Sequence, residues 1–450
     1  MPSDRLFGPS FTTDAMQAIV SDVAWVQRML DVEAAISRAE ARTGLVPVEA
    51  AEAIQACCDA GRFDVEQLGR QAVAAGNPVI PLVRALTAAV PEEAARYVHW
   101  GATSQDVLDT ATMLIARDGL DLIDADLDGV AAACARLAER HRSTIMPGRT
   151  LLQHALPITF GLKAAGWLTA TLDAHHRLAD LRGRLAVQFG GAAGTLAALG
   201  IRGLEVSREF SAELGLAEPV LPWHTARGRV AELAGALGLV AGTMGKIALD
   251  VALMAQTEVG ELSEPPEQGR GGSSSMPHKR NPVEAIAVGA CVRGVQGQVG
   301  ILLAAMVQEH ERAAGAWQAE WPALSEALRL TAGAVSRMSE LMEGLDVHVE
   351  RMRSNLEQTG QRLTSEHVMM VLAERTGRQR AHDLVEAAAG EAAGTGRALR
   401  DVLFADPVVS QHLSPDQIDA ALDPATYLGS AEELVDRALT AYEAERSAAT

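Results

Sequence analysis

The sequence predicts an all-α fold, and both its composition and its hydrophobic periodicity point to helices. Hydrophobic residues make up 48% of the 450-residue chain, whereas aromatic residues make up only 4%. Alanine and leucine are abundant and are strong helix formers, while aromatic and β-branched residues lead in strands. A chain of this length and apolar content can bury a large core, and it has room for two or three domains.

Three segments carry apolar residues in alternating steps of three and four, which places one apolar stripe along a helix. The stripes are Leu120, Ile123, Leu127, Val130, Cys134 and Leu137; Leu233, Leu237, Val240, Met244, Ile247, Val251 and Met254; and Val288, Val292, Val295, Val299, Leu302 and Met306. Such stripes suit long helices packed side by side at a shallow angle. The residues flanking the second and third stripes are also apolar. This favours helices that are shared with other subunits, and a large bundle within one chain is the alternative.

Proline and glycine divide the chain and mark loops between the expected helices. They occur at residues 76–78, 147–148, 190–191, 219–222, 265–272 and 423–424. The longest polar stretch, residues 265–282, is rich in glycine and serine, is basic, and lies between two very apolar segments. Long loops in compact proteins are often functional.

Charge and cysteine content restrict the possible partners. The net charge of -19 argues against nucleic acid, because phosphate binding needs a basic face, but a local group of Arg and Lys can still hold a small anion. The four cysteines form no CxxC pair and no zinc spacing, so no metal is predicted and a reducing, cytoplasmic compartment fits. Neither a signal peptide nor an uninterrupted apolar run of about 18 residues is found, so no membrane partner is predicted.

Three polar segments carry the residue types of a binding or catalytic site. In residues 271–282, a Gly-rich backbone lets N–H groups approach an anion, and Lys279 can stabilise negative charge; a flexible linker is the alternative. In residues 99–106, Thr103 and Ser104 stand at an expected helix start, where hydroxyls and N–H groups bind anions; a plain N-cap is the alternative. Residues 148–157 form the third segment, which contains His154.

These segments resemble signatures of the fumarase/aspartase superfamily. Residues 272–282 are similar to GSSxMPxKxNP, residues 99–106 to the HxGxTSxD region of adenylosuccinate lyases and carboxymuconate cycloisomerases, and residues 148–157 to GRTHxQxAxP. The likeness extends over nearly the whole chain. One departure stands out, because Leu151 occupies the place of a histidine that acts as general acid, or orients one, in many members. The carboxymuconate cycloisomerases are similar in this respect, with an apolar residue there and a Gln-His-Ala triplet.

The resemblance implies roles for individual residues. Ser273 would be the catalytic base, and Lys279 and Asn281 would hold a substrate carboxylate. His99 would orient or polarise a substrate carboxylate. His154 would assist as an acid, because it is expected about one helical turn from Leu151; a solvated or structural role is the alternative. The residues that would bind substrate are Thr103, Ser104, Thr150, Gln153, Arg227 and Arg312. For the two arginines a solvated helix face or a structural ion pair is the alternative.

The implied subunit has three domains, namely an N-terminal helical domain (1–105), a central bundle of five long helices (106–345) and a C-terminal helical domain (346–450). Four subunits would form a homotetramer with a twenty-helix core, and each active site would take segments from three subunits. The implied activity is the cycloisomerase reaction, an intramolecular lyase step. It converts 3-carboxy-cis,cis-muconate, a small tricarboxylate, to 4-carboxymuconolactone in protocatechuate breakdown, with no cofactor. A fumarate-releasing lyase of the adenylosuccinate lyase type and a non-catalytic structural homologue are the alternatives.

Overall fold

The computed structural model describes residues 6–265, 276 and 279–449. The expected catalytic base, Ser273, therefore lies outside the described residues. The chain divides into two compact units, each built from three stretches. Unit 1 comprises Met1–Asp128, Asp173–Lys246 and Ile286–Ser339, and unit 2 comprises Gly129–Leu172, Ile247–Ala285 and Glu340–Thr450.

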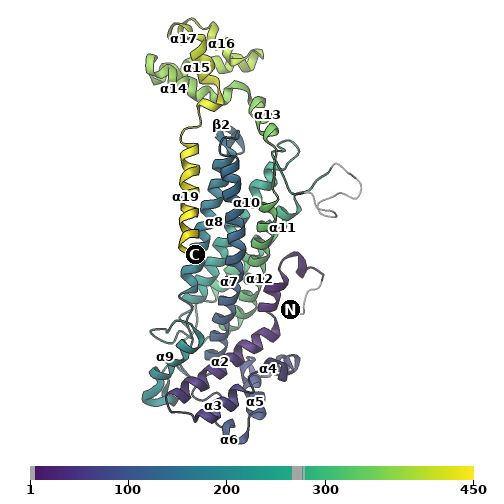
Figure 1. The fold of residues 1–450 in the computed structure, drawn as a ribbon, viewed down its shortest axis with the longest axis vertical. Helices are drawn as coiled ribbons and strands as arrows, with labels where there is room; N and C mark the ends of the chain where they lie inside the picture. Colours follow the sequence, from purple (N-terminus) through teal and green to yellow (C-terminus); the bar gives the residue numbers. More distant parts are fainter. Residues whose placement is uncertain (1–5, 266–275, 277–278, 450) are drawn as a thin grey trace. The chain divides into compact units, whose positions relative to one another are not determined.

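Most of the described chain is helical, which confirms the predicted all-α class. Five long helices occupy the central part of the sequence, as expected, and they appear in Figure 1. They are α7 (Ser104–Arg140), α8 (Phe160–Arg182), α10 (Gly228–Met254), α11 (Val283–Ala304) and α12 (Ala316–Glu343). The predicted boundaries near residues 105 and 345 lie next to the start of α7 and the end of α12.

The predicted apolar stripes follow these helices. The first two stripes are buried along α7 and α10 throughout. The third stripe follows α11 from Val288 to Leu302, with Val299 half-buried. Met306 was expected to continue this stripe, but α11 ends at Ala304 and Met306 is exposed. The periodicity therefore predicted the three helices correctly and overran the end of the third.

Unit 1 also contains shorter helices. They are α1 (Asp14–Ile19), α2 (Asp22–Arg42), α3 (Val48–Gln55), α4 (Val65–Ala75), α5 (Val79–Ala89), α6 (Glu92–Ala95) and α9 (Gly203–Leu214), with 3-10 turns at η1 (Gly8–Ser10), η2 (Ala60–Arg62) and η3 (Ala197–Arg202). Helix α2 begins after Ser21, whose hydroxyl accepts a hydrogen bond from the N–H of Ala24. It packs on both α3 and α9 (Figure 1).

Unit 2 contains a separate cluster of short helices. They are α13 (Val349–Thr359), α14 (Ser365–Thr376), α15 (Arg378–Thr395), α16 (Leu399–Ala405), α17 (Pro407–His412) and α18 (Pro415–Leu422), followed by α19 (Ala431–Ala449), with 3-10 turns at η4 (Gly360–Thr364) and η5 (Pro424–Thr426). Helices α14 to α18 enclose an apolar core that includes Val368, Leu372, Leu403 and Ile418.

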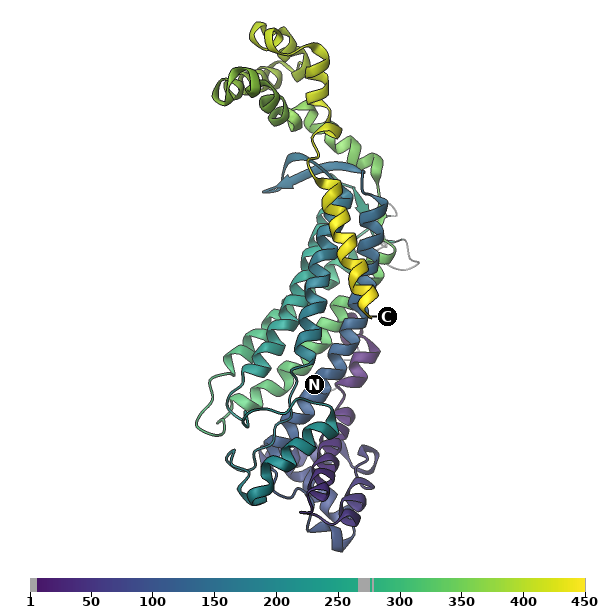
Figure 2. The ribbon, with the colours of Figure 1, turned by 60° about the vertical axis from the view of Figure 1, so that its left-hand side comes forward.

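Two short antiparallel pairs of strands depart from the expected helices and loops. Strand β1 (Ile145–Thr150) pairs with β2 (Gln153–Thr159) and packs against α13 (Figure 2), and β3 (Leu262–Ser263) pairs with β4 (Asp346–Val347). Pro147 and Gly148 were expected to form a loop between helices, and this prediction was wrong. They lie within β1, where the register shifts between Pro147 and Arg149. Such an irregularity accommodates proline and glycine in a strand.

Two helices, α10 and α11, are long and apolar enough to cross a membrane by length and composition alone, although no uninterrupted apolar run had suggested one. Core helices pass the same test, so it is weak grounds for a membrane span. Within the single chain, only 44% and 28% of their most apolar windows are buried. Large apolar side chains remain exposed on both helices, namely Leu239, Leu249, Ile286, Ile301 and Leu303.

Candidate active site

The first turn of α7 contains a buried carboxylate that gathers four hydrogen-bond donors. Oδ1 of Asp106 accepts from the N–H of Gly190 at 3.0 Å and lies 2.7 Å from Nε2 of His224. Oδ2 accepts from the N–H of Gly191 at 2.8 Å and of Thr103 at 3.1 Å. A fully buried carboxylate is stable only when its oxygens are satisfied in this way. Asp106 therefore joins the start of α7 to two loops that are distant in sequence.

The glycine turn at residues 190–191 is required by this arrangement. A Cβ at Gly190 would lie 2.7 Å from Cβ of Pro222 and 2.9 Å from Cε1 of His224. Gly191 has a φ of +68°, in the region that favours glycine. The sequence predicted a Gly-rich turn between helices here, and the structure confirms it. The turn needs glycine because its backbone packs closely against Pro222 and His224 while its N–H groups donate to the carboxylate of Asp106.

Arg227 lies in a buried ion-pair network in unit 1. Its Nη1 and Nη2 donate to Asp109 at 2.7 and 3.0 Å, and its Nε and Nη2 donate to Glu320 at 3.0 and 2.5 Å. Burial lowers the pKa of Arg227, but the two carboxylates outweigh it and the net shift is upward. The guanidinium also lies over the ring of Trp223. Every nitrogen of this predicted substrate-binding group is thus engaged within the protein.

Arg312 is placed differently from Arg227. Its Nη1 donates to Oε1 of Gln105 at 3.2 Å, and its Nη2 donates to the carbonyl of Ala192 at 2.9 Å. These partners are neutral, and no carboxylate among the described residues lies within ion-pair distance. The side chain is half-buried. Arg312 therefore offers an uncompensated positive charge beside the start of α7, as a group that binds an anionic substrate would.

His99 lies before α7 and contacts helix α2. Its Nδ1 is 2.6 Å from Oε1 of Glu33, whose side chain is almost fully buried. Burial lowers the pKa of His99, but the charge of Glu33, its hydrogen bond and the charge of Asp106 raise it, and the net shift is upward. The backbone of His99 is left-handed, with a φ of +58°. The predicted site residues Thr103 and Ser104 follow directly in the chain.

In unit 2, the segment with Thr150, Gln153 and His154 forms the tip of the β1–β2 hairpin. Leu151 and Leu152 form its two-residue turn, with φ of +49° and +65°, and both side chains are exposed. Positive φ at both central residues is the geometry of a type I′ turn. Thr150 and Gln153 pair across the hairpin and are also exposed.

The expectation that His154 lies one helical turn from Leu151 was wrong, because the segment is a hairpin. His154 instead pairs across the strands with Arg149, and its Nδ1 lies 2.5 Å from Oγ1 of Thr359. Burial and the positive charge of Arg149 lower the pKa of His154, and Glu261 acts in the opposite direction. His154 is therefore favoured in its neutral form, and it does not share a helix face with Leu151.

The hairpin is anchored by residues that the sequence analysis did not single out. Arg149 donates to both carboxylate oxygens of Glu261, and the amide of Asn355 donates to the same carboxylate at 2.8 Å. Glu261 is fully buried. No local signal marks these partners, because they lie far apart in the chain.

The described end of the 265–282 stretch leads into α11. Lys279 is exposed, and its N–H donates to the carbonyl of Met276 at 3.0 Å. The carbonyl of Asn281 accepts from the N–H of Val283 at the first position of α11. The carboxylate of Glu264 caps this helix by accepting from two of its N–H groups. Lys279 and Asn281 are therefore positioned by a helix start, whereas Ser273 is outside the described residues.

The predicted site residues thus fall into two groups, one in each unit. Unit 1 holds His99, Thr103, Ser104, Arg227 and Arg312, and unit 2 holds Thr150, Gln153, His154, Lys279 and Asn281. Sequence reasoning did not single out Glu33, Asp109 and Glu261, which fix these groups, and it included Asp106 only as the last position of the 99–106 segment. The spacing of Asp106 and Asp109, three apart at the start of a helix, was a further available signal.

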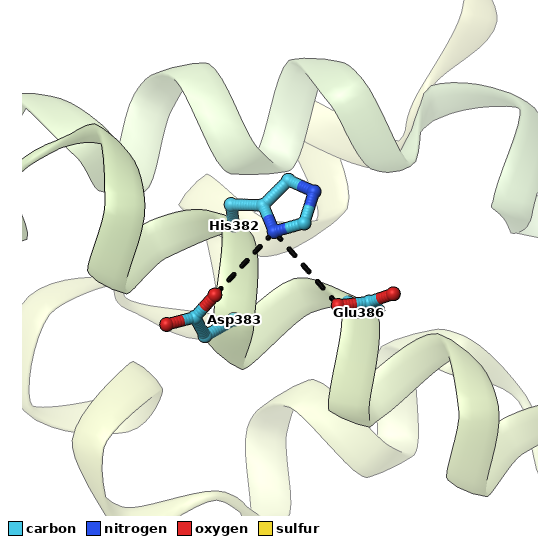
Figure 3. Close-up of side chains that lie close together, drawn as sticks. All are labelled: His382, Asp383 and Glu386. Carbon is cyan, nitrogen blue, oxygen red and sulfur yellow. Dashed lines mark ion pairs between the residues drawn. The ribbon is translucent and has the colours of Figure 1, made fainter.

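Within the part of the chain that the structure describes, one group of side chains has metal-ligand spacing. His382, Asp383 and Glu386 lie close together on α15 (Figure 3). All three are exposed, and Asp383 also accepts a hydrogen bond from Gln379. Exposed acidic groups are common without an ion. Ion pairing on a solvated helix face accounts for this cluster. The four cysteines are free thiols, as expected.

Comparisons with known proteins match the whole chain. The model of the lyase family matches residues 9–299, and that of the adenylosuccinate lyase C-terminus matches residues 362–438. A 3-carboxy-cis,cis-muconate cycloisomerase of Bradyrhizobium diazoefficiens is 50% identical over 442 residues, which cover 97% of this chain and 98% of that protein. A nitrosuccinate lyase of Streptomyces davaonensis is 46% identical over 449 residues, covering 96% and 94%.

The fold agrees with these matches. The crystal structure of the 3-carboxy-cis,cis-muconate lactonizing enzyme from Pseudomonas putida superposes with a TM-score of 0.90 at 47% identity, covering 97% of this chain and 98% of that one. Family match, full-length identity and fold point the same way. The chain belongs to the lyase family of the fumarase/aspartase superfamily.

Proposed function

We propose that the chain is a 3-carboxy-cis,cis-muconate cycloisomerase, which closes its substrate to 4-carboxymuconolactone. The observation that carries this proposal is Leu151, an exposed turn residue where many lyases of the superfamily place a histidine. A leucine side chain cannot transfer a proton to a leaving group. Lactonisation has no departing fragment, because the attacking carboxylate and the diene belong to the same molecule. The full-length likeness to a cycloisomerase supports the same conclusion.

The proposed chemistry is an isomerisation in which all atoms are retained. One substrate carboxylate attacks a carbon of its own diene, and the adjacent carbon, which lies alpha to another carboxylate, gains a proton. Ser273 transfers this proton, and Lys279 stabilises the negative charge that develops on the neighbouring carboxylate. No step requires a metal or a cofactor.

The substrate carries three carboxylates, so the site needs several cations and N–H donors. Arg312 supplies a charge without a carboxylate partner among the described residues, and His99 supplies a second cation. Thr103 and Ser104 offer donors at the start of α7, while Asn281, Thr150 and Gln153 complete the substrate contacts and His154 assists. Arg227 is better suited to position α7 and α12 than to bind substrate, because Asp109 and Glu320 already occupy its guanidinium.

The active enzyme is proposed to be a cytoplasmic homotetramer of three-domain subunits with active sites shared between copies. Exposed apolar side chains on α10 and α11 support this assembly, since large apolar patches mark protein contacts. The division of the site residues between two groups is also what a shared site would produce. Nucleic acid and membranes are not proposed as partners.

A fumarate-releasing lyase remains the second candidate. The 46% identical relative from Streptomyces davaonensis is named a nitrosuccinate lyase, and a lyase of that kind uses related carbon-acid chemistry. A lyase would need a proton donor for its leaving group, and His154, the histidine nearest to Leu151 in sequence, would have to be protonated first, which its lowered pKa disfavours.

An ultraviolet assay separates the two candidates. The purified chain is incubated with 3-carboxy-cis,cis-muconate, adenylosuccinate or nitrosuccinate, and the loss of diene absorbance or the gain of fumarate or nitrite is followed. We expect loss of the diene with the first substrate only, and we expect Ser273→Ala to abolish it. Turnover of adenylosuccinate or nitrosuccinate without turnover of 3-carboxy-cis,cis-muconate would reject the proposed cycloisomerase activity.

A further inference from the structure

We propose that Glu33 is a positioning residue that holds His99 as an imidazolium, so that Nε2–H binds a carboxylate of the substrate. This inference rests on the proposed function, in which His99 faces a tricarboxylate. It gives the proposed site a cationic hydrogen-bond donor in addition to Arg312 and Lys279. Glu33 itself touches His99 and not the substrate.

The contact between the two side chains is short and shielded from water. Nδ1 of His99 lies 2.6 Å from Oε1 of Glu33, and the Glu33 side chain is 1% exposed. Oε2 of Glu33 has no hydrogen-bond partner among the described residues. A buried carboxylate that stays ionised needs a charged or hydrogen-bonding partner, and His99 is the group that touches Glu33. The contact therefore favours the imidazolium form of His99, with Nδ1–H directed at Oε1 of Glu33 and Nε2 also protonated.

Two other acids near this pair, Glu40 and Asp106, are consistent with a protonated His99. Burial raises the pKa of Glu40, two helical turns along α2, to about 9, and the charge of Glu33 adds to the effect. Both oxygens of Glu40 lack hydrogen-bond partners in the described chain. Glu40 is thus neutral at pH 7 and does not compete for the imidazolium. Asp106, on α7, is the other carboxylate whose charge raises the His99 pKa, which has a net upward shift against burial.

The backbone shows that His99 is held in place at a cost. Its φ of +58° is uncommon for any residue other than glycine, and Gly101, two residues on, has a φ of +70°. Such strain persists only where the surroundings over-determine it, and it gathers at active sites. With Nδ1 engaged by Glu33, the ring orientation is fixed and Nε2–H is left to donate. The geometry is that of a preorganised donor to an anion.

The test follows the His99 protonation state directly. In the wild-type enzyme without substrate, NMR titration of the His99 ring should give a pKa above the ordinary value near 6.5. In Glu33→Gln, which keeps an acceptor for Nδ1 but removes the charge, the His99 pKa should fall by about one unit or more. Glu66→Gln, which removes an exposed acid of α4 that pairs with Arg70, makes the same chemical change away from His99 and is the control; it should leave the His99 pKa unchanged.

Turnover supplies the second measurement. The wild-type kcat/KM should decline as pH rises through the His99 pKa, and in Glu33→Gln this decline should move to lower pH. At pH 8 we expect kcat/KM to drop about 10-fold to 100-fold, the value of a charge-assisted hydrogen bond. Glu33→Asp should recover part of the loss.

Each outcome decides a separate point. If Glu33→Gln lowers kcat but leaves the pH at which kcat/KM declines unchanged, Glu33 is merely structural and the proposal is overturned. A wild-type His99 pKa at or below the ordinary value would also overturn it. The wild-type titration needs no variant, so it decides the matter even if Glu33→Gln does not fold. A raised His99 pKa in a protein that does not consume the muconate would reject the proposed function while supporting the Glu33–His99 pairing.

Discussion

Arg149 holds both carboxylate oxygens of Glu261, with Nη1 and Nη2 at 2.8 and 2.7 Å. This bidentate pair lies next to the tip of the β1–β2 hairpin, where Arg149 pairs across the strands with His154. Glu261 also accepts from Asn355 on α13, so the same carboxylate links the hairpin to its supporting helix. The exposed tip therefore projects from a fixed base.

Replacing Arg149 by Met should destabilise the fold strongly, because it leaves Glu261 as an unpaired buried charge. The expected loss is about 3–5 kcal/mol in the free energy of unfolding, measured by urea titration. Arg182→Met, which breaks an exposed pair with Asp121, is the control and should cost less than about 1 kcal/mol. The double variant Arg149→Met with Glu261→Gln should recover part of the loss. Equal effects of the two arginine variants would contradict the assigned role of burial.

Asp106→Asn should lower turnover while the chain still folds. An asparagine amide cannot accept hydrogen bonds from all four groups that donate to Asp106, so the glycine turn should shift. Arg312 should shift with it, because its guanidinium donates to the carbonyl of Ala192. A displacement of about 1 Å costs roughly 100-fold in rate. The measurement is kcat/KM with the far-ultraviolet spectrum as a check on folding. Asp121→Asn, at an exposed acid on the same helix, should leave kcat/KM unchanged, and a similar drop in both variants would refute the prediction.

Two glycines with similar backbone angles allow strain to be separated from crowding. Gly76→Ala, at φ +76° with open space around it, should cost about 1 kcal/mol from backbone strain alone. Gly101→Ala, at φ +70°, adds a Cβ 2.5 Å from Cδ2 of Leu199 and should cost about 2–4 kcal/mol. In a Leu199→Ala background the extra cost of Gly101→Ala should largely vanish. Chemical denaturation measures all four stabilities, and an undiminished cost in that background would exclude the clash.

Glu40→Gln should stabilise the protein increasingly as pH rises. The folded state keeps the proton of Glu40 up to pH about 9, whereas the unfolded state loses it near the ordinary value. Folding therefore takes up a proton between these two values, and wild-type stability falls as pH rises across that window by at most about 1.4 kcal/mol per pH unit. The variant lacks this dependence. Unfolding midpoints at pH 5, 7 and 9 should diverge steadily, and parallel midpoints would contradict the raised pKa.

Replacing the two leucines at the hairpin tip should raise stability and lower activity. Asn and Gly suit a type I′ turn, whereas Leu151 and Leu152 are strained there. Replacing the pair by Asn-Gly should raise thermal stability, by about 1 kcal/mol or more. If the tip contributes to an active site in a second copy, turnover should fall despite the gain. Unchanged turnover would place the two leucines outside the site, and light scattering reports whether assembly is altered.

The sequence predicted what depends on local pattern and missed what depends on distant partners. Apolar steps of three and four located α7, α10 and most of α11, because each stripe is complete within one helix. The hairpin was missed because Pro147 and Gly148 usually end elements, and a bulge is not visible in composition. That error also misplaced His154 relative to Leu151, since helical spacing was assumed.

The interior of the candidate site was beyond local inference for the same reason. Asp106 is 84 residues from Gly190 and 118 residues from His224, so nothing near it in the chain announces its partners. The family resemblance implied that Arg227 binds substrate, with a structural ion pair as one alternative. Its burial between Asp109 and Glu320 follows only from the fold.

The exposed leucine and isoleucine side chains of α10 and α11 have a consequence for biosynthesis. If copies associate through these helices as proposed, a newly made copy presents the side chains to water until it assembles, and aggregation competes with assembly during that interval. Yield in a heterologous host should therefore rise when synthesis is slower or the temperature is lower. Slower induction, or a raised supply of chaperone, lowers the concentration of uncovered copies.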